Sequence, residues 1–405
     1  MGPTLLCDKS AIQTLNRASP VLLHHYFRII IPPILVTEIL GDLAKETNGS
    51  TVQSVKMLAN KVASISAFPN VDFRLLFSSE LDGKSVSMNR CPVVAVGNSI
   101  EARTGEIGLE LADDPNEQAL DRWRRGDFSV DEHLMSKVWR YQKDKLDWRT
   151  LIKMLDGIYS SNLKKKTNFR DVLEFVDDLM ASNPEFLANW FCRSFQINKK
   201  ATYDQCAHAL NTSSYSSFCV RITLFALWSM HFGLVTPKAD NQLDLEYLFY
   251  LPFAKTFVTH DKFQKAIAPH FLKEDQTMVD FTRLAKDLLR LSTWLASLEE
   301  EAKSKELQRD GPPENPDSIC HEMWVKYMGS EYRNREQLAR SQEMDRKIRD
   351  RFQQFLTGKR SDDSTSWPPV ESASFIIKKQ TLLVTDPCPC RSGKAYKDCH
   401  GIAMT

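Results

Sequence analysis

The start of the chain alternates between short apolar runs and helical periodicity, and this alternation constrains the fold more than any other feature. The runs TLLC, at residues 4–7, and FRIIIPP, at residues 27–33, are typical of buried strands. Helical stretches are expected from Ser10, from Ser19 and from Ile34. Because strands that alternate with helices favour a parallel sheet covered by helices, we expect an α/β fold.

The same alternation returns much later in the chain. Residues 246–272 read EYLFYLPFAKTFVTHDKFQKAIAPHFL, which predicts a helix, a strand over TFVT and a second helix from Asp261. Residues 116–207, in between, are highly charged and mostly helical in pattern. The sequence therefore predicts a parallel-sheet core that is interrupted by a large, mostly helical insertion.

At 405 residues the chain is too long for one ordinary domain. A polar, turn-rich stretch, TGKRSDDSTSWPPVESAS, precedes the last part of the chain and predicts a linker. The predicted organisation is an α/β domain in two parts, 1–45 and 215–278, an insertion at 46–214, a helical extension at 279–360, a linker at 361–374 and a small tail module at 375–405.

The last residues of the chain carry a cluster of soft ligands. Cys388, Cys390, Cys399 and His400 give a Cys-x-Cys pair and a Cys-His pair with eight residues between them. Four sulfur and nitrogen ligands suit tetrahedral Zn²⁺ better than Mg²⁺ or Ca²⁺. So small a unit cannot fold on apolar burial alone, and we expect a structural zinc to stabilise it.

This tail, PCPCRSGKAYKDCHG, resembles the SEC-C motif, the carboxyl-terminal zinc module of the bacterial preprotein-translocase ATPase. It departs from the pattern at Arg391, where glycine is usual, and at His400, which replaces a cysteine and preserves zinc ligation. The resemblance implies an interaction appendage that docks a protein, a ribosome or nucleic acid, and not a catalyst.

Acidic residues stand where the predicted strands end. Asp8 follows the first strand, and Asp261 follows the strand TFVT. Carboxylates at the carboxyl ends of parallel strands can converge into a cup for hard divalent cations. Each acid also has a structural interpretation, as a helix cap or as part of a solvated helix face. The rest of the predicted set lies on helices: Glu38, and either Asp244 or Asp240.

The stretches LLCDKSAIQTL, IIIPPILVTEILGDL and DLEYLFYLPFAKTFVTHDKF resemble the PIN-like nuclease superfamily over residues 4–45 and 235–272. The resemblance implies a three-layer α/β fold in which acidic residues bind Mg²⁺ or Mn²⁺. Metal-activated water would then hydrolyse phosphodiester bonds, with RNA as the expected substrate. Its acids correspond to Asp8, Glu38, Asp244 (or Asp240) and Asp261. Asp244 lies 206 positions after Glu38, which again requires a large insertion.

Two further patterns concern nucleic acid. DRWRRGDF and WRYQKDKLDWR interleave basic and aromatic residues, and a Lys-Lys-Lys run begins at Lys164. Such a surface suits single-stranded nucleic acid, although a tryptophan core with solvated charges is the preferred interpretation. His260, beside Asp261, could contact a phosphate or have a structural role.

The remaining features favour a cytoplasmic protein. The cysteines outside the tail have no disulfide-framework spacing, which predicts free thiols. Residues 219–235 form the most apolar run, and their Arg221 and His231 favour a buried helix over a membrane span. The leading functional hypothesis is a metal-dependent PIN-like ribonuclease with a zinc tail. The alternative is a non-catalytic adaptor that uses the same scaffold and tail to bind a protein or ribosome.

Overall fold

The computed structural model describes most of the body of the chain. It covers residues 2–15, 19–44, 51–65, 68–93, 97–101, 107–111, 115–145, 165–210, 214–238, 240–307, 311–329 and 381–383. The predicted linker at 361–374 and the predicted zinc ligands Cys388, Cys390, Cys399 and His400 lie outside these residues, as does the end of the predicted extension.

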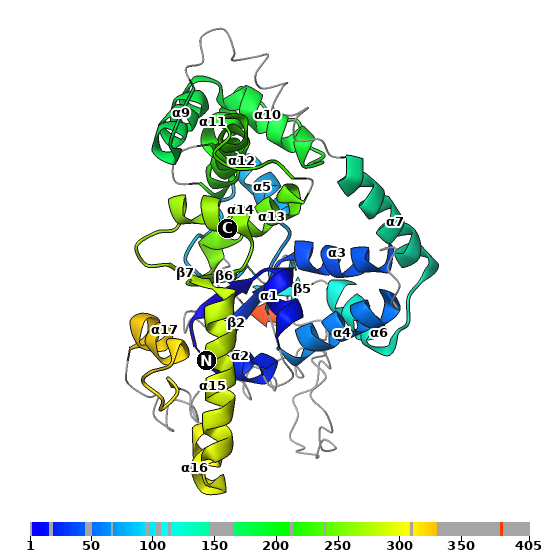
Figure 1. The fold of residues 1–405 in the computed structure, drawn as a ribbon. Helices are drawn as coiled ribbons and strands as arrows, with labels where there is room; N and C mark the ends of the chain where they lie inside the picture. Colours follow the sequence, from blue (N-terminus) through cyan, green and yellow to red (C-terminus); the bar gives the residue numbers. More distant parts are fainter. Residues whose placement is uncertain are drawn as a thin grey trace.

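A parallel sheet of five strands forms the centre of the molecule, in the order β3-β2-β1-β6-β7 (Figure 1). The strands are β1 (Thr4–Cys7), β2 (Arg28–Ile31), β3 (Phe68–Pro69), β6 (Thr256–Thr259) and β7 (Thr277–Asp280). Strand β3 is only two residues long, so four strands carry most of the sheet. The expected α/β fold with a parallel sheet is confirmed. Strand β7 was not among the strands predicted from the sequence.

Both faces of the sheet are covered, which explains why strands β1, β2 and β6 are buried along their whole length. Leu5, Cys7 and Val258 belong to one buried cluster, whereas Leu6 and Phe257 belong to another. Neighbouring residues of a strand point to opposite faces, so the two clusters are the cores on either side of the sheet.

The first core, which contains Leu5, Cys7 and Val258, lies beneath helices from both ends of the described chain. These are α1 (Lys9–Thr14), α2 (Ser19–Tyr26), α3 (Pro33–Gly41), α4 (Thr51–Ser64), α15 (Phe281–Ser297) and α17 (Ile319–Met328). Helices α15 and α2 pack together although they are far apart in sequence (Figure 1). Thus part of the predicted insertion, α4 with β3, and part of the predicted extension, α15, contribute to the sheet and its cover, and β7 crosses the predicted boundary after residue 278.

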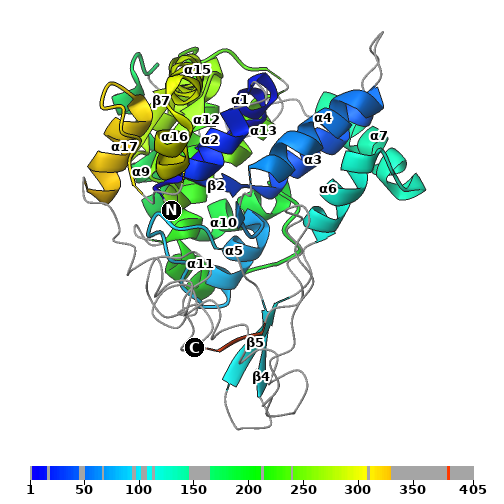
Figure 2. The same cartoon turned by 90° about the horizontal axis from the view of Figure 1, so that it is seen from below.

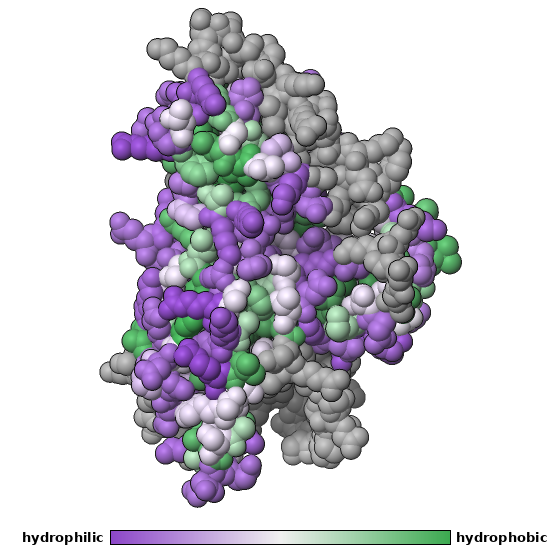
Figure 3. Space-filling view, in the orientation of Figure 1, coloured by the Kyte–Doolittle hydropathy of each residue, from purple (hydrophilic) through white to green (hydrophobic). Residues whose placement is uncertain are grey.

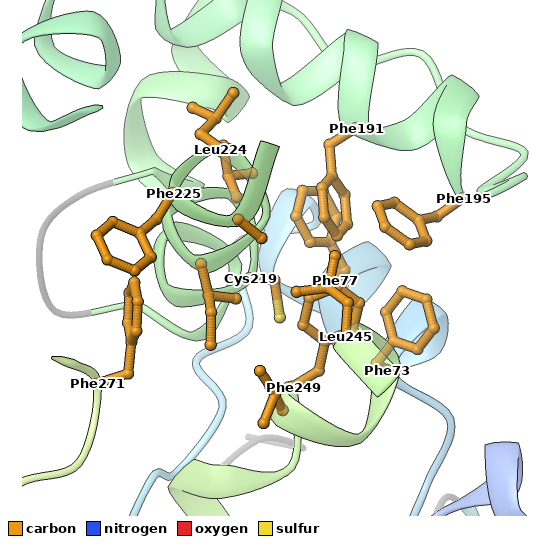
Figure 4. Packing of buried hydrophobic residues seen from close by; sticks show 14 of the residues in the cluster. Phe73, Phe77, Phe191, Phe195, Cys219, Leu224, Phe225, Leu245, Phe249 and Phe271 are labelled. Atoms are coloured by element: carbon orange, nitrogen blue, oxygen red, sulfur yellow. The ribbon is translucent and has the colours of Figure 1, made fainter. Parts of the chain in front are cut away.

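The second core is rich in phenylalanine (Figure 4). It is covered by α5 (Phe73–Leu81), α9 (Phe169–Ser182), α10 (Pro184–Ser194), α11 (Tyr203–Ala209), α12 (Tyr215–His231), α13 (Asn241–Leu248) and α14 (Lys262–Ile267). The rings of Phe77 and Phe191 stack at 4.6 Å, and those of Phe191 and Phe195 lie 4.5 Å apart. Helix α12 is buried along nearly its whole length, as predicted for the apolar run. Among the described residues no helix is long and apolar enough to cross a membrane.

The remaining elements flank this body. Helices α6 (Pro115–Arg125) and α7 (Val130–Lys145) lie beside α3 and α4 in both ribbon views (Figures 1 and 2). An antiparallel sheet joins β4 (Gly97–Glu101), β5 (Ile107–Leu111) and β8 (Thr381–Leu383). The predicted helical extension begins with two separate helices, because α15 ends at Ser297 and α16 (Glu300–Leu307) begins three residues later.

Candidate functional site

The chain connections from the neighbouring strands β1 and β6 lead to opposite edges of the sheet. From β1 the chain proceeds to β2 on one side, whereas β6 lies on the other side and leads to β7. Open α/β sheets place their ligand sites at such a switch point, outside the carboxyl ends of the strands. Asp8 directly follows β1, and Asp261 comes two residues after the end of β6. Both predicted acids therefore lie at the position where this topology favours a site.

Asp8 is buried, with 4% of its surface exposed, and its carboxylate is fully engaged. It caps α1 by accepting a hydrogen bond from the backbone N–H of Ala11 at 2.7 Å. The hydroxyls of Ser10 and Thr259 lie 2.9 and 2.8 Å from its oxygens. Burial raises the pKa of Asp8, and the negative charge of Asp261 raises it further. The three hydrogen bonds lower this pKa but do not cancel the rise.

Thr259 and Gln264 connect the acids of different elements. The Thr259 hydroxyl lies 2.8 Å from Asp8 and 2.6 Å from the side-chain oxygen of Gln264, and it accepts from the backbone N–H of Asp261. The Gln264 amide donates to the backbone oxygen of Asp244 at 3.0 Å. Asp261 caps α14 through the N–H of Gln264 at 2.8 Å. These contacts fix β1, β6, α13 and α14 relative to one another.

Glu38 lies on α3, the helix after β2, and is held by a residue of α13. The phenol of Tyr247, on α13, donates to Glu38 Oε2 at 2.7 Å. Tyr247 is buried, and burial together with the nearby charge of Glu38 raises the pKa of its phenol, which keeps the hydrogen-bond donor protonated. Lys9 donates to the Glu38 backbone oxygen and to the Asp42 carboxylate at 2.7 Å, so its charge is already paired.

Electrostatic coupling shows that the predicted acids share one environment. The pKa of Asp244 is raised to about 9, first by burial and then by the negative charges of Asp261, Glu38, Asp8 and Asp240. A carboxyl group surrounded by like charges in this way gains a proton unless a cation is present. Four acids that come from four separate elements thus lie close enough to interact electrostatically near the carboxyl edge of the sheet.

The alternative third acid, Asp240, is exposed and lies just before α13, whereas Asp244 is half-buried on that helix. Both contribute charge at the site. Carboxylate oxygens are the ligands that Mg²⁺ and Mn²⁺ prefer. Within the described ranges, however, no three Asp, Glu, His or Cys side chains are grouped as metal ligands. Asp8 and Asp261 serve as helix caps, and Glu38 is turned to Tyr247, so a metal would require some of these side chains to rotate.

The structural interpretation holds for part of the basic and aromatic pattern. Trp123 is buried in the first core, with 2% of its surface exposed. Lys166 lies over the ring of Phe175, at 5.7 Å. Lys164, Trp148 and Arg149 fall outside the part of the chain that is described. His260 is exposed, and its Nδ1 lies 3.3 Å from the Thr282 hydroxyl.

Sequence reasoning missed the residues that hold the acids in place, namely Thr259, Gln264 and Tyr247. Thr259 ends a predicted strand, and Gln264 is the third residue of the helix that Asp261 caps, so only their neighbourhood was indicated. Tyr247 contacts Glu38 across 209 positions, and no local pattern gives that contact.

The six cysteines outside the tail agree with the expectation of free thiols. Cys7, Cys91, Cys192, Cys206, Cys219 and Cys320 are all free. Burial raises the pKa of Cys7, Cys192, Cys206, Cys219 and Cys320, so these thiols stay protonated and unreactive.

Comparison with known proteins finds a known motif at the carboxyl end of the chain. Residues 385–402 match the SEC-C motif. A stretch of 74 residues is 36% identical to "Protein translocase subunit SecA" of Cellvibrio japonicus (strain Ueda107). This stretch covers 18% of the present chain and 8% of that protein. No solved structure matches the chain. The matched motif contains all four predicted zinc ligands, and the chain therefore carries a SEC-C motif at residues 385–402.

Proposed function

We propose that the protein is a metal-dependent nuclease of the PIN-like type that hydrolyses phosphodiester bonds in RNA. Asp8, Glu38, Asp244 and Asp261 would hold Mg²⁺ or Mn²⁺, and Asp240 would add negative charge at the rim. Such ions activate water and stabilise the leaving oxygen of a phosphodiester. The SEC-C motif would bind a structural zinc through Cys388, Cys390, Cys399 and His400 and dock a partner or nucleic acid.

The observation that carries the proposal is the coupling of Asp244 to the other acids. Its pKa is raised to about 9, first by burial and then by the negative charges of Asp261, Glu38, Asp8 and Asp240. Strong perturbation of a cluster of titratable groups is typical of functional sites. The cluster also lies at the switch point between β1 and β6, where the topology of the sheet favours a ligand.

The residues of the site would have two roles, metal binding and positioning of the metal ligands. The carboxylates supply hard oxygen ligands. Tyr247 orients Glu38, and Thr259 with Gln264 holds the groups around Asp8 and Asp244. Binding of the cation would replace mutual repulsion by attraction, which is the change that lets a half-buried Asp244 stay ionised at neutral pH.

Cleavage of labelled single-stranded RNA by the full chain tests the proposal. We expect cleavage with Mn²⁺, none with EDTA, and a loss of at least about 100-fold in Asp8→Asn and Asp244→Asn, on the scale expected when a carboxylate that contributes to metal-assisted catalysis is neutralised. Asn is as good a helix cap as Asp, so Asp8→Asn preserves the start of α1 and isolates the charge.

A matched control is Asp178→Asn, which removes an exposed carboxylate on α9 far from the cluster in sequence. Its activity should equal that of the wild type. If the wild type and Asp8→Asn cleave equally, the assignment of the site fails. If no preparation cleaves RNA with Mn²⁺, the nuclease proposal itself fails.

The SEC-C motif favours one second candidate, a non-catalytic adaptor that binds a protein or ribosomal surface. An adaptor would bind through the tail and would not depend on the acids. Co-sedimentation with ribosomes should then be lost in a chain that ends at residue 384 and kept in Asp8→Asn. Equal sedimentation of the full and shortened chains would remove the ribosomal form of this candidate.

A further inference from the structure

A cavity of about 480 Å³ lies between α15 and the start of α17, on the side of the molecule away from the phenylalanine core. Three basic residues of α15, Arg283, Lys286 and Arg290, line one wall. The other wall carries Asp317, Ser318 and Glu322. Figure 3 shows strongly hydrophilic residues gathered over α15 and α17. This cavity belongs to neither the acidic cluster nor the SEC-C motif.

The basic residues are spaced to form one row. They occupy positions i, i+3 and i+7 of α15 and are all exposed, so they follow the same face of the helix over about 10 Å. Arg290 pairs with the buried carboxylate of Asp287 at 2.9 Å. Arg283 lies 3.9 Å from Glu322, a long contact. For Lys286 no ion pair is found among the residues that the structure describes.

The N-terminus of α17 does not supply the positive charge of this cavity. Its backbone N–H at Cys320 already meets the Ser318 hydroxyl at 3.1 Å and the Asp287 carboxylate at 3.2 Å. Asp287 also accepts from the Ser318 hydroxyl at 2.7 Å. The cationic character therefore resides in the side chains of α15, of which Arg283 and Lys286 are the most available.

The row begins beside the acidic cluster. Strand β7 ends at Asp280, on the same edge of the parallel sheet as Asp8 and Asp261, and α15 starts at the next residue. His260 precedes Asp261 and reaches the Thr282 hydroxyl at 3.3 Å. Arg283 follows Thr282, so His260 and Thr282 connect the end of β6 to the start of the basic row.

We propose that this row is a phosphate track, in which Arg283, Lys286 and Arg290 hold the backbone of a single-stranded RNA as it leaves the acidic cluster. The inference rests on the proposed nuclease function. Exposed guanidinium and ammonium groups neutralise phosphates with little regard to base sequence. The acidic wall limits affinity, since Glu322 competes with a phosphate for Arg283, and this suits a strand that must be released.

Binding of fluorescent single-stranded RNA in EDTA, measured by anisotropy at several salt concentrations, tests the track without cleavage. Arg283→Gln/Lys286→Gln should weaken binding and reduce the slope of log K against log salt by about 1.4, because each lost phosphate contact on a single strand is worth about 0.7. Arg283→Lys/Lys286→Arg should retain both the affinity and the slope.

Lys303→Gln/Lys305→Gln on α16 is the matched control, since it removes the same charge from the surface beyond the cavity. It should leave the slope unchanged. Glu322→Gln should tighten binding, because it frees Arg283 from its acidic neighbour. Thermal melting of each variant checks that these exposed substitutions leave the fold intact.

The outcomes separate this inference from the function on which it rests. If the wild type cleaves RNA but the α15 variant binds with unchanged affinity and slope, the track is wrong and the nuclease stands. If RNA binds through α15 but is never cleaved, the track stands and the nuclease fails. The track is also overturned if the wild type does not bind RNA, if the α16 control loses as much, or if polyglutamate displaces the RNA at equal charge concentration.

Discussion

The charge of Asp244 depends strongly on its surroundings. Its pKa is raised to about 9 by burial and by the acids around it, from a usual value of 3.8. A raised carboxyl pKa means that the folded protein binds a proton that the unfolded chain has already released. The free energy of unfolding therefore decreases as pH rises from about 4 through about 9, and it is highest at the acid end of that range.

This coupling predicts how pH and metal act on stability. Without divalent metal, we expect the wild type to lose more than about 1.4 kcal/mol, the value of one pKa unit, between pH 5 and pH 8.5. Asp244→Asn should lose clearly less, because its amide does not ionise. Chemical unfolding monitored by circular dichroism at the two pH values measures the difference.

The metal dependence provides the control for that experiment. Millimolar Mn²⁺ should restore the stability of the wild type at pH 8.5 and have a much smaller effect on Asp244→Asn. Glu246→Gln is a matched variant, since burial raises the pKa of Glu246 to about 7 but its ion-pair partner is Arg74. It should keep the Mn²⁺ response. A wild type that is equally stable at both pH values would contradict the coupling.

At the residue scale, the positions of Asp8 and Asp261 after strands could be predicted, and the residues that contact the acids could not. Asp8 and Asp261 follow apolar runs, so their place at strand ends follows from local sequence. Thr259 bonds Asp8 across 251 positions, and Tyr247 bonds Glu38 across 209. Such contacts arise only when β1, β6 and α13 are brought together by the sheet, and no periodicity in the sequence carries that information.

At the scale of elements, one buried carboxylate joins α15 to α17. Asp287, on α15, has 1% of its surface exposed and accepts hydrogen bonds from Ser318 and from the N–H of Cys320. It caps a helix that starts 32 positions later, where Ser318 alone would satisfy fewer donors. Packing of α17 on α15 thus depends on a polar contact as well as on apolar burial.

Asp287→Ala should therefore lower the free energy of unfolding by about 3 kcal/mol, because it leaves buried donors without an acceptor and Arg290 without its partner. Denaturant unfolding measures this loss. Glu322→Ala, an exposed acid on α17, should change stability by less than about 0.5 kcal/mol. Equal effects of the two substitutions would show that the buried contact has no special role.

Most elements near the sheet were predictable because their signals are local. β1, β2 and β6 are short runs that end near an acid or a proline, and helical periodicity follows each of them. β7 was missed since it is short, lies at the sheet edge and is mostly half-buried, which weakens its apolar pattern. Residues 280–305 keep helical periodicity across the break between α15 and α16, so no local pattern indicates that break.

At the scale of the whole molecule, the SEC-C motif lies after the body of the chain. A chain that ends at residue 384 should lose about one zinc per molecule and keep the melting temperature and RNA cleavage of the full protein. Metal analysis, with thermal melting of both chains, measures this. Equal zinc content in the two chains, or zinc-free full chain under reducing conditions, would contradict zinc binding by the motif.

The pairing of β1 with both β2 and β6 also sets an order of folding during synthesis. β1 can pair with β2 once about 30 residues are made, but β6 is made roughly 250 residues after β1. At about 5 to 20 residues per second, the other edge of β1 stays without its partner for roughly 10 to 50 s. An unpaired apolar strand edge invites pairing with other chains. The nascent protein therefore has to protect its own first strand for most of its synthesis.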